Sequence, residues 1–466
     1  MRLFAFGLLG LALTGLARPA VAPPPAPYEA LARDVLRELV EIPSTESGVG
    51  STPAARAVEK RLLDAGFPRE DVLVVGPNER KMNLVARLRG TGKGRPILLL
   101  SHLDVVEARA EDWSPEFPPF RFVEKDGYYY GRGTQDIKDG AALLVANFVR
   151  WKKEGFRPSR DLVLALTADE ETGTDNGVEW LLRHRRELVD AEYCLNTDAG
   201  DFQSKAGRPY LVAVAAAEKK VTVLRLETTN PGGHGALPRR DNAIYEIGAA
   251  LARVEAFRFP VMPSPLTRAE LERTAALETG AVAADLRAAA AGTADEAVLA
   301  RLSENPQYNA ILRTTCVPTK LDAGHASNAL PQRARAFLNC RILPGHDPAD
   351  VRAAIRRAIP DAAVDVAWEA IEPVTAPASE MNPVVLRAVE ETAARLWPGV
   401  AVSPILELGG SDGRFLRVAG IPTYGASGVF LDVDDSRAHG RDERVRASAL
   451  AGGVAFYDGL VHALAR

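Results

Sequence analysis

Helix-like and strand-like patterns alternate along the first half of the chain. Apolar residues recur every three or four positions from Tyr28 to Val40 and again from Ala54 to Ala65, which predicts amphipathic helices. A third helical run extends from Lys138 to Lys153. Short apolar runs between them predict strands at Met82 to Leu88, Pro96 to Leu100, Leu162 to Thr167 and Tyr193 to Asn196. This order predicts an α/β fold with a mostly parallel sheet flanked by helices.

The pattern changes near Glu218. Alternating apolar and polar residues at Val221 to Leu226 and Ala334 to Leu343 flank an alanine-rich helical stretch from Arg268 to Leu302. From about Pro373 the alternation of helix and strand returns, with a helix at Pro383 to Leu396 and an apolar, turn-rich region from Ile421 onward. We therefore expect a main domain built from residues 28–217 and 371–466, interrupted by an inserted α+β domain at residues 218–370.

The N-terminus has the pattern of a secretory signal. Met1-Arg2 precedes an apolar run from Leu3 to Leu16, which is followed by small residues and then by prolines. The run is too short to span a bilayer. Residues 1–22 are therefore expected to be a signal peptide and leader, and the mature protein to be periplasmic or secreted without stable membrane insertion. An uncleaved anchor is the alternative.

Composition and charge limit the kinds of molecule that the protein is expected to bind. The 466 residues carry a formal net charge of -4, with basic and acidic residues interspersed, so no broad positive field is available for a nucleic acid backbone. The three cysteines, Cys194, Cys316 and Cys340, are too few for a disulfide framework, although export would permit one bridge. Cys194 lies in an apolar strand and is expected to be a buried small hydrophobe. A small molecule is the expected ligand.

Acidic and histidine residues follow three of the predicted strands. Ligand sites in open α/β sheets lie beyond the carboxyl ends of the strands, so these residues are candidates for chemistry. A further acid, Asp136, follows a glycine-rich turn that allows the backbone to approach an ion. The residues at the strand ends are His102 and Asp104, Asp169-Glu170-Glu171, and Asp198.

Two local patterns suggest roles. In His102-x-Asp104, both side chains fall on one side of an extended chain, so the carboxylate can orient the imidazole. The adjacent carboxylates of Glu170 and Glu171 repel each other unless a cation or a proton binds to one of them. One carboxylate then binds metal while the other moves protons. A solvated acidic turn is the structural alternative for this pair.

Taken in order, the motifs of this chain resemble those of the co-catalytic zinc exopeptidases and aminoacylases. That family includes glutamate carboxypeptidase, carboxypeptidase S, aminoacylase and succinyl-diaminopimelate desuccinylase, and the carboxypeptidase S-like branch is the most similar. The resemblance covers nearly the whole mature chain. Its motifs are Ser101-His102-Leu103-Asp104, Gly131-Arg132-Gly133-x-x-Asp136-x-Lys138, Asp169-Glu170-Glu171-Thr172-Gly173, Asn196-Thr197-Asp198, Gly232-Gly233-His234-Gly235, Asn328-Ala329-Leu330-Pro331, Cys340-Arg341-Ile342-Leu343-Pro344-Gly345, Gly409-Gly410-Ser411-Asp412-Gly413 and Ala438-His439-Gly440.

The resemblance implies a zinc-exopeptidase-like catalytic domain that holds two metal ions bridged by Asp136. His102 and Asp198 would hold one ion, and Glu171 and His439 the other. Nitrogen and oxygen ligands without thiolates suit Zn²⁺, and Co²⁺ or Mn²⁺ can substitute.

The resemblance also implies the catalytic roles. Glu170 would be the general base, and Asp104 would brace His102. His234 would reach into the site from the inserted domain, so that domain closure places a positive partner beside the developing oxyanion.

Substrate contacts are implied in the same way. Arg341 would clamp a free substrate carboxylate through both oxygens, and Asn328 would hydrogen-bond the same end of the substrate. Backbone amides at Gly410 and Ser411 would face the substrate, while Glu443 would support the loop that carries the last metal ligand.

These assignments predict a hydrolase that cuts an amide bond next to a free carboxylate and releases a C-terminal amino acid. An N-acyl-amino-acid amidohydrolase is the alternative, because it needs the same residues. A single-metal or aminopeptidase-type enzyme is another alternative, but an amine-binding site would call for an acid where Arg341 stands. An exported binding protein without catalysis is the remote alternative. The inserted domain is either a lid or a homodimer contact.

Overall fold

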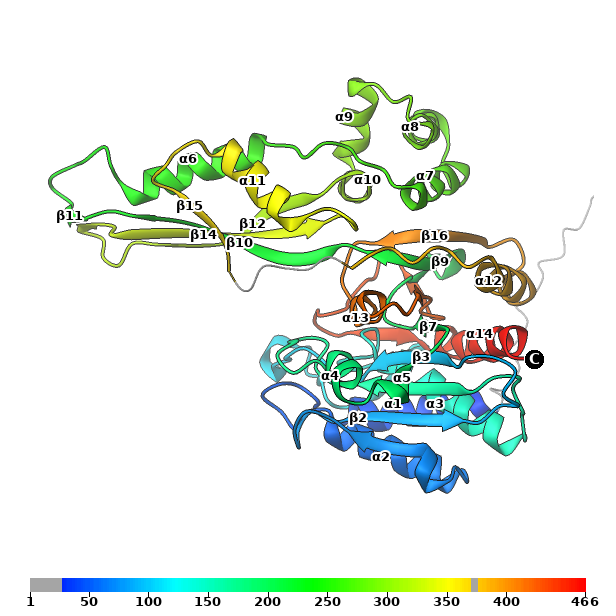
Figure 1. Cartoon of the computed structure of the whole chain (residues 1–466). Coiled ribbons are helices and arrows are strands. Elements are labelled where there is room, and N and C mark those ends of the chain that lie inside the picture. Colours follow the sequence, from blue (N-terminus) through cyan, green and yellow to red (C-terminus); the bar gives the residue numbers. More distant parts are fainter. Residues whose placement is uncertain (1–26, 370–375) are drawn as a thin grey trace, which may run out of the picture.

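The computed structural model describes residues 27–369 and 376–466, which form two lobes (Figure 1). One lobe is the main domain, and the other is an elongated inserted domain that projects from it. The expected signal segment and the expected boundary at residues 370–371 lie outside the described residues.

A ten-stranded sheet forms the centre of the main domain. Its order is β1-β2-β6-β3-β7-β17-β9-β8-β18, with β16 paired to β9. The strands β6, β3, β7 and β17 pair in parallel, whereas antiparallel pairs occur toward both edges. The expected α/β class is confirmed. The strands are β1 (Val72–Val75), β2 (Asn83–Leu88), β3 (Ile97–His102), β6 (Leu162–Thr167), β7 (Tyr193–Asn196), β8 (Phe202–Lys205), β9 (Arg208–Glu218), β16 (Ala401–Glu407), β17 (Thr423–Gly425) and β18 (Phe430–Asp432).

Helices cover both faces of this sheet. In β3, Ile97 and Leu99 belong to one apolar core, while Leu98 and Leu100 belong to the core on the other face. This two-residue alternation explains why the central strands are apolar throughout. Cys194 is fully buried in β7, as expected. The first face carries α1 (Pro27–Val40), α2 (Thr52–Asp64), α3 (Lys138–Lys153), α12 (Pro383–Leu396) and α14 (Ala447–Leu464), and the second carries α4 (Gly177–His184), α5 (Arg186–Val189) and α13 (Gly413–Val418).

The C-terminal region differs from the expectation of turns. Residues 447–464 form α14, the one described helix whose length and mean hydropathy of 1.2 would suit a membrane span. Half of it is buried inside the fold. A Cβ at Gly453 would lie 2.9 Å from Leu143 of α3 and 3.0 Å from the Gly428 carbonyl, so glycine here permits close packing.

The inserted domain is built on a four-stranded antiparallel sheet of order β12-β14-β10-β15. Apolar residues of α6 and α11 pack on one face of it. A disulfide joins Cys316 of β12 to Cys340 of β14. The elements are β10 (Lys220–Thr229), β11 (Gly233–His234), α6 (Ala243–Ala256), β12 (Thr315–Ala323), β13 (Ala329–Leu330), β14 (Arg333–Ile342), α11 (Pro348–Ala358) and β15 (Asp365–Trp368).

The alanine-rich stretch forms three short helices rather than one, and a fourth short helix follows it. They have their own apolar core and lie above β16 of the main domain (Figure 1). Gly280 and Gly292 have positive φ angles of 63° and 74°, which separates α8 from its neighbours, and Pro306 begins the last helix. The helices are α7 (Pro265–Leu277), α8 (Gly280–Ala291), α9 (Glu296–Glu304) and α10 (Pro306–Leu312).

The remaining elements lie beside the main sheet. A three-stranded sheet contains β4 (Val123–Lys125), β5 (Tyr128–Tyr130) and β19 (Arg444–Arg446), and two 3-10 turns are η1 (Arg69–Asp71) and η2 (Ala110–Asp112). The strand β19 brings the segment after His439 next to the chain that leads to Asp136.

Candidate metal centre

Three side chains meet at the carboxyl ends of β3 and β7. His102 is the last residue of β3, Asp198 follows β7 by two residues, and Asp136 lies in the turn before α3. The His102 Nε2 atom is 3.2 Å from Asp136 Oδ1 and 3.8 Å from Asp198 Oδ1. One potential ligand atom from each residue falls within 4.8 Å of the others.

A second group shares Asp136. His439 Nε2 is 2.9 Å from Asp136 Oδ2 and 3.1 Å from Glu171 Oε1. These three residues also offer atoms within 4.8 Å of one another. Because Asp136 uses Oδ1 in one group and Oδ2 in the other, its carboxylate lies between two potential cation sites.

The buried charges of this cluster fit cations. Asp198 Oδ2 is buried and has no hydrogen-bond partner among the described residues. Burial, together with repulsion from Asp136 and Asp412, raises the pKa of Asp198 to about 8. Hydrogen bonds to Asp136 and Glu171 raise the pKa of His439 to about 10. The carboxylates thus attract positive charge, and the histidine and oxygen donors suit divalent metals.

The backbone carbonyl and the side-chain carboxylate of Asp104 have different hydrogen-bond partners. The His102 Nδ1 atom lies 3.0 Å from the Asp104 carbonyl oxygen, whereas the Asp104 carboxylate is 3.8 Å away. That carboxylate accepts hydrogen bonds from the backbone amides of Glu170 and Glu171, at 3.2 and 3.0 Å. If Nδ1 carries the proton, the backbone bond leaves Nε2 free to face the cluster. Asp104 therefore orients both His102 and the two glutamates.

The turn after β6 is held by a network around Asp169. This residue has a positive φ of 62°, and its carboxylate pairs with Lys81 at 3.0 Å. The backbone amide of Asp175 and the hydroxyl of Thr174 also donate to it. These contacts hold the chain in the conformation that directs Glu170 and Glu171 to the strand ends.

Glu443 ties together the two loops that supply the shared and the last ligand. Its fully buried carboxylate accepts hydrogen bonds from the amides of Gln135 at 2.7 Å and Asp136 at 3.2 Å. It also pairs with Arg132 at 2.6 Å, and Arg132 donates to the His439 carbonyl at 3.3 Å. The supporting role expected for Glu443 therefore extends to the Asp136 loop.

Glu170 lies beside this cluster with a partner that the motifs did not assign. Arg414, at the start of α13, places Nη1 3.2 Å from Glu170 Oε1. Burial and the charges of Asp198 and Asp412 raise the pKa of Glu170 well above its ordinary value, against the opposing charges of His102 and Arg414. A carboxyl group in this position, beside the potential metal ligands, can act as a general base or acid. The only sequence signal for Arg414 was its position directly after Gly413.

The glycine-rich turn lies where the inserted domain joins the main domain. A Cβ on Gly410 would be 3.4 Å from both Arg414 Nη1 and Val221 of β10. The amide and hydroxyl of Ser411 both donate to Glu218, at 2.8 and 2.7 Å. Ser411 is fully buried, so the substrate-binding role expected for it has no free donor in this conformation.

Arg341 lies at the same junction. It is next to the end of β14 and opposite Val221 of β10. Its guanidinium donates to the Leu408 carbonyl at 3.4 Å and to Asn339 at 3.0 Å. Arg341 is thus adjacent to the glycine-rich turn, and its role as a clamp stays a prediction.

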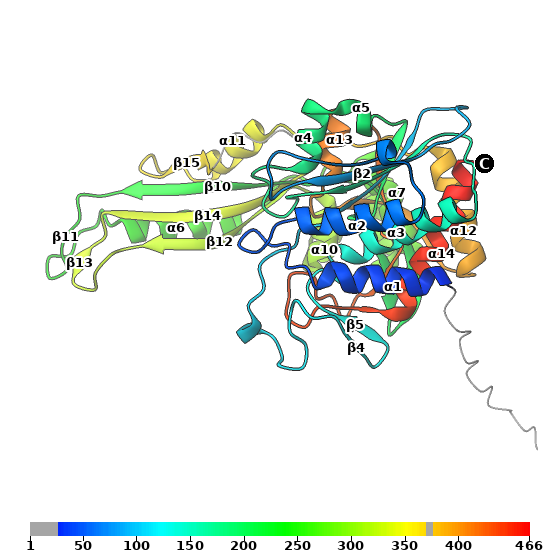
Figure 2. The same ribbon diagram turned by 90° about the horizontal axis from the view of Figure 1, so that it is seen from below.

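His234 and Asn328 lie at the opposite end of the inserted domain. His234 pairs with Ala329 in the β11–β13 ribbon, and the Gly235 amide donates to the Asn328 carbonyl at 2.8 Å. Figures 1 and 2 show this ribbon at the distal tip of the domain. Ten residues of β10 separate the tip from the junction, which is about 33 Å at a strand's rise per residue. Within this conformation, Asn328 does not share a substrate end with Arg341, and His234 does not reach the cluster.

Comparisons with known proteins agree with this arrangement. Residues 98–463 match the model of peptidase family M20/M25/M40. The chain is 28% identical over 384 residues to probable carboxypeptidase S-like 2 of Dictyostelium discoideum, a match that covers 79% of this chain and 71% of that protein. It is also 28% identical over 376 residues to the N-fatty-acyl-amino acid synthase/hydrolase PM20D1 of Xenopus tropicalis, covering 78% and 72% of the two chains.

A solved structure shares the fold. The M20 family metallo-carboxypeptidase Sso-CP2 from Sulfolobus solfataricus superposes with a TM-score of 0.70 at 17% identity, over 92% of this chain and 98% of that one. The likeness therefore includes both lobes.

Because Asp136 belongs to both ligand groups, its replacement should change how many metal ions the protein binds. We expect the wild-type protein to retain two equivalents of Zn²⁺ after dialysis, and Asp136→Asn to retain fewer than one, because both groups lose a charged ligand. Asp198→Asn is expected to retain about one equivalent, since it belongs to one group. Elemental analysis of the dialysed proteins measures this, and two equivalents bound to Asp136→Asn would contradict a shared ligand.

Proposed function

Because the chain belongs to peptidase family M20/M25/M40, we propose that this hydrolytic metalloenzyme cuts an amide bond next to a free carboxylate and releases a C-terminal amino acid. The observation that carries the proposal is the Asp136 carboxylate, which lies between two ligand groups with Glu170 alongside. Two Zn²⁺ ions are the proposed metals, with Co²⁺ or Mn²⁺ as substitutes. When bound, such ions lower the pKa of water and polarise a carbonyl oxygen.

Glu170 supplies the proton transfers in this proposal. Its carboxylate accepts a proton from the attacking water, and the resulting carboxylic acid then donates it to the leaving amine. Arg414 holds Oε1 at 3.2 Å, and the amide of Glu170 is held by Asp104. The base is therefore oriented before substrate arrives.

Arg341 provides the specificity for a free carboxylate. A planar guanidinium binds both oxygens of a carboxylate, and burial lowers the pKa of Arg341 without a neighbouring acid to neutralise it. Its present acceptors, the Leu408 carbonyl and Asn339, are neutral groups. A substrate carboxylate would be the stronger partner.

His234 is proposed to complete the site as a partner of the oxyanion. It lies about 33 Å along the ribbon from the junction, so either a large domain closure or a second copy of the chain must bring it to a metal centre. We propose a homodimer in which the inserted domain of one copy reaches the other. The exposed residues Val317 and Leu321 on the edge strand β12 offer a surface for such a contact.

N-acyl-amino-acid hydrolysis is the second candidate. The relative from Xenopus tropicalis carries the name N-fatty-acyl-amino acid synthase/hydrolase, and its reaction would use the same metal ligands, base and carboxylate clamp. The group on the acyl side of the bond distinguishes the two reactions.

Export to the periplasm or the medium is proposed for the mature chain. The signal-like pattern of residues 1–22 supports it, and so does the disulfide between Cys316 and Cys340, since disulfides persist in oxidising compartments. The N-terminal sequence of protein recovered from culture fractions tests this proposal.

Substrate release tests the proposed reaction. We expect the zinc-loaded protein to release amino acid from N-blocked dipeptides or N-acyl amino acids, and chelator to abolish the release. In Glu170→Gln, turnover is expected to fall roughly 10²–10⁴-fold, because general-base catalysis is lost, while metal content stays at two equivalents. Loss of metal along with activity would instead make Glu170 a ligand, and full activity would remove it from catalysis.

The clamp predicts a dependence on the terminal carboxylate. Arg341→Ala is expected to raise KM for free-acid substrates by about tenfold or more, since a charge-assisted pair is lost, with little change for the slow amidated analogues. Arg333→Ala, a change to an exposed arginine of the same strand, is the control. An equal loss on free acids and amides would contradict the clamp.

Mixing two inactive variants tests His234. His234→Ala and Glu170→Gln are each expected to be nearly inactive, yet mixed dimers would contain one centre with both native residues. Activity should therefore return after subunit exchange. If mixed dimers form and stay inactive, His234 does not act between subunits.

A further inference from the structure

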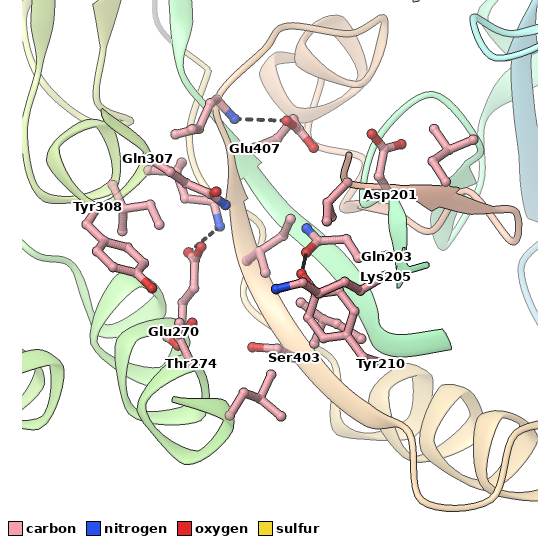
Figure 3. A pocket seen from close by; sticks show the side chains of 18 of the residues that line it. Asp201, Gln203, Lys205, Tyr210, Glu270, Thr274, Gln307, Tyr308, Ser403 and Glu407 are labelled. Carbon is pink, nitrogen blue, oxygen red and sulfur yellow. Dashed lines mark hydrogen bonds between the residues drawn. The ribbon is translucent and has the colours of Figure 1, made fainter. Parts of the chain in front are cut away.

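The helices α7–α10 enclose a cavity against the catalytic sheet. Its volume is about 610 Å³, and its walls come from α7 and α10 on one side and from β8, β9 and β16 on the other (Figure 3). Glu270 of α7 accepts a hydrogen bond from the Leu406 amide of β16 at 2.8 Å, which fixes the helix to the sheet. The cavity is within the size range of small-molecule sites.

This cavity adjoins the metal-binding cluster. Asp201, which lines it, is three residues beyond Asp198, and Ser436 on its wall is three residues before His439. Leu408 lines the cavity as well, and its carbonyl accepts the hydrogen bond from Arg341. A substrate held by the cluster and by Arg341 would therefore have this space beside it.

Acidic side chains dominate the lining. Among the described residues of the wall, five are acids and Lys205 is the one base. Four of the acids accept hydrogen bonds. Glu407 accepts backbone amides, Asp432 the Gly207 amide and Glu278 the Tyr308 hydroxyl, while Glu270 accepts the Leu406 amide at one oxygen only. Asp201 is the fifth acid.

Glu270 is a buried carboxylate with spare hydrogen-bonding capacity. Only 6% of its surface is exposed. Its Oε2 accepts the Leu406 amide, and no partner occurs for Oε1 among the described residues. Burial raises the pKa of Glu270 to about 8, with the charge of Glu407 adding to the effect. A buried carboxylate with one amide partner is costly, and a cation beside it would relieve that cost.

Asp201 faces the same space. It is exposed to the cavity and makes no hydrogen bond or ion pair with another described residue. Figure 3 shows its carboxylate on the sheet side of the cavity and Glu270 on the helix side. The two acids lie on different walls of the cavity, and neither forms an ion pair with a described base.

We propose that this cavity is a specificity pocket that takes a positively charged group of the substrate, an ammonium or a guanidinium. The proposal rests on the proposed amide hydrolysis at the metal centre. Leu277 and Ile311 on the wall suit the methylene stem that carries such a group. The group has two possible sources, the side chain of the released amino acid or the acyl side of the scissile bond.

Matched substrates distinguish the two sources. N-acetyl-L-lysine and N-acetyl-L-norleucine differ at the end of the released side chain, and 6-aminohexanoyl-L-alanine and hexanoyl-L-alanine differ at the end of the acyl chain. We expect kcat/KM of the cationic member to exceed that of the neutral member by about tenfold or more in one pair, as one ion pair in a partly buried site allows.

Variants of the acids in the cavity test whether these acids cause the preference for a cationic substrate. The double variant Asp201→Asn with Glu270→Gln should bring the ratio of the two kcat/KM values close to one, and Gln keeps an acceptor for the Leu406 amide. Glu272→Gln, on the exposed side of the same helix, is the matched control and should keep the wild-type ratio. A ratio at or below one in both wild-type pairs, or a ratio unchanged in the double variant, would overturn the proposal.

A binding measurement without turnover tests the pocket independently of the proposed hydrolysis. Zinc-loaded Glu170→Gln is titrated calorimetrically with the same four compounds. If the wild-type protein hydrolyses none of them, the proposed reaction is wrong for these compounds, but tighter binding of a cationic member still supports the pocket. Equal binding within both pairs overturns it.

Discussion

Negative charge concentrated at the carboxyl ends of β3, β6 and β7 is the constraint on which the rest of the structure depends. Carboxylates from three separate segments meet there, and Asp198 has a buried oxygen without a partner. Carboxylates this close together stay ionised only when cations lie beside them. His102 and His439 lie against these carboxylates, and hydrogen bonds to Asp136 and Glu171 raise the pKa of His439 to about 10. Two divalent ions would neutralise the same charges and supply the chemistry for hydrolysis.

The residues around the metal-binding cluster hold it in place, and the proposed substrate contacts lie on one side of it. Glu443 fixes the loops of Asp136 and His439, and Asp104 fixes the amides of Glu170 and Glu171. The junction with the inserted domain then brings Arg341 to the edge of the site, while α7–α10 add an acidic cavity beside it. Metal binding and substrate selection are thus assigned to different parts of the chain.

Short-range patterns predicted the central strands of the sheet and marked His102, Glu171 and Asp198 as candidates at strand ends and Asp136 after a glycine turn. The ligand roles, and His439 altogether, came from the family resemblance. Contacts between distant segments were not predictable in this way. Arg414 is separated from Glu170 by 244 positions, and nothing local indicates their pairing. The region from Ile421 onward was expected to be rich in turns, whereas residues 447–464 form α14, in which Gly453 permits close packing on α3. The position of His234 depends on the length of the inserted ribbon, which the local glycine motif around it does not indicate.

Anomalous diffraction from a crystal of the zinc-loaded protein tests the central claim most directly. Data collected on both sides of the zinc absorption edge should show two peaks about 3.5–4 Å apart, one on each side of the Asp136 carboxylate, with His102 at one and His439 at the other. A single peak, or two peaks that do not both contact Asp136, would contradict a two-metal centre bridged by this residue.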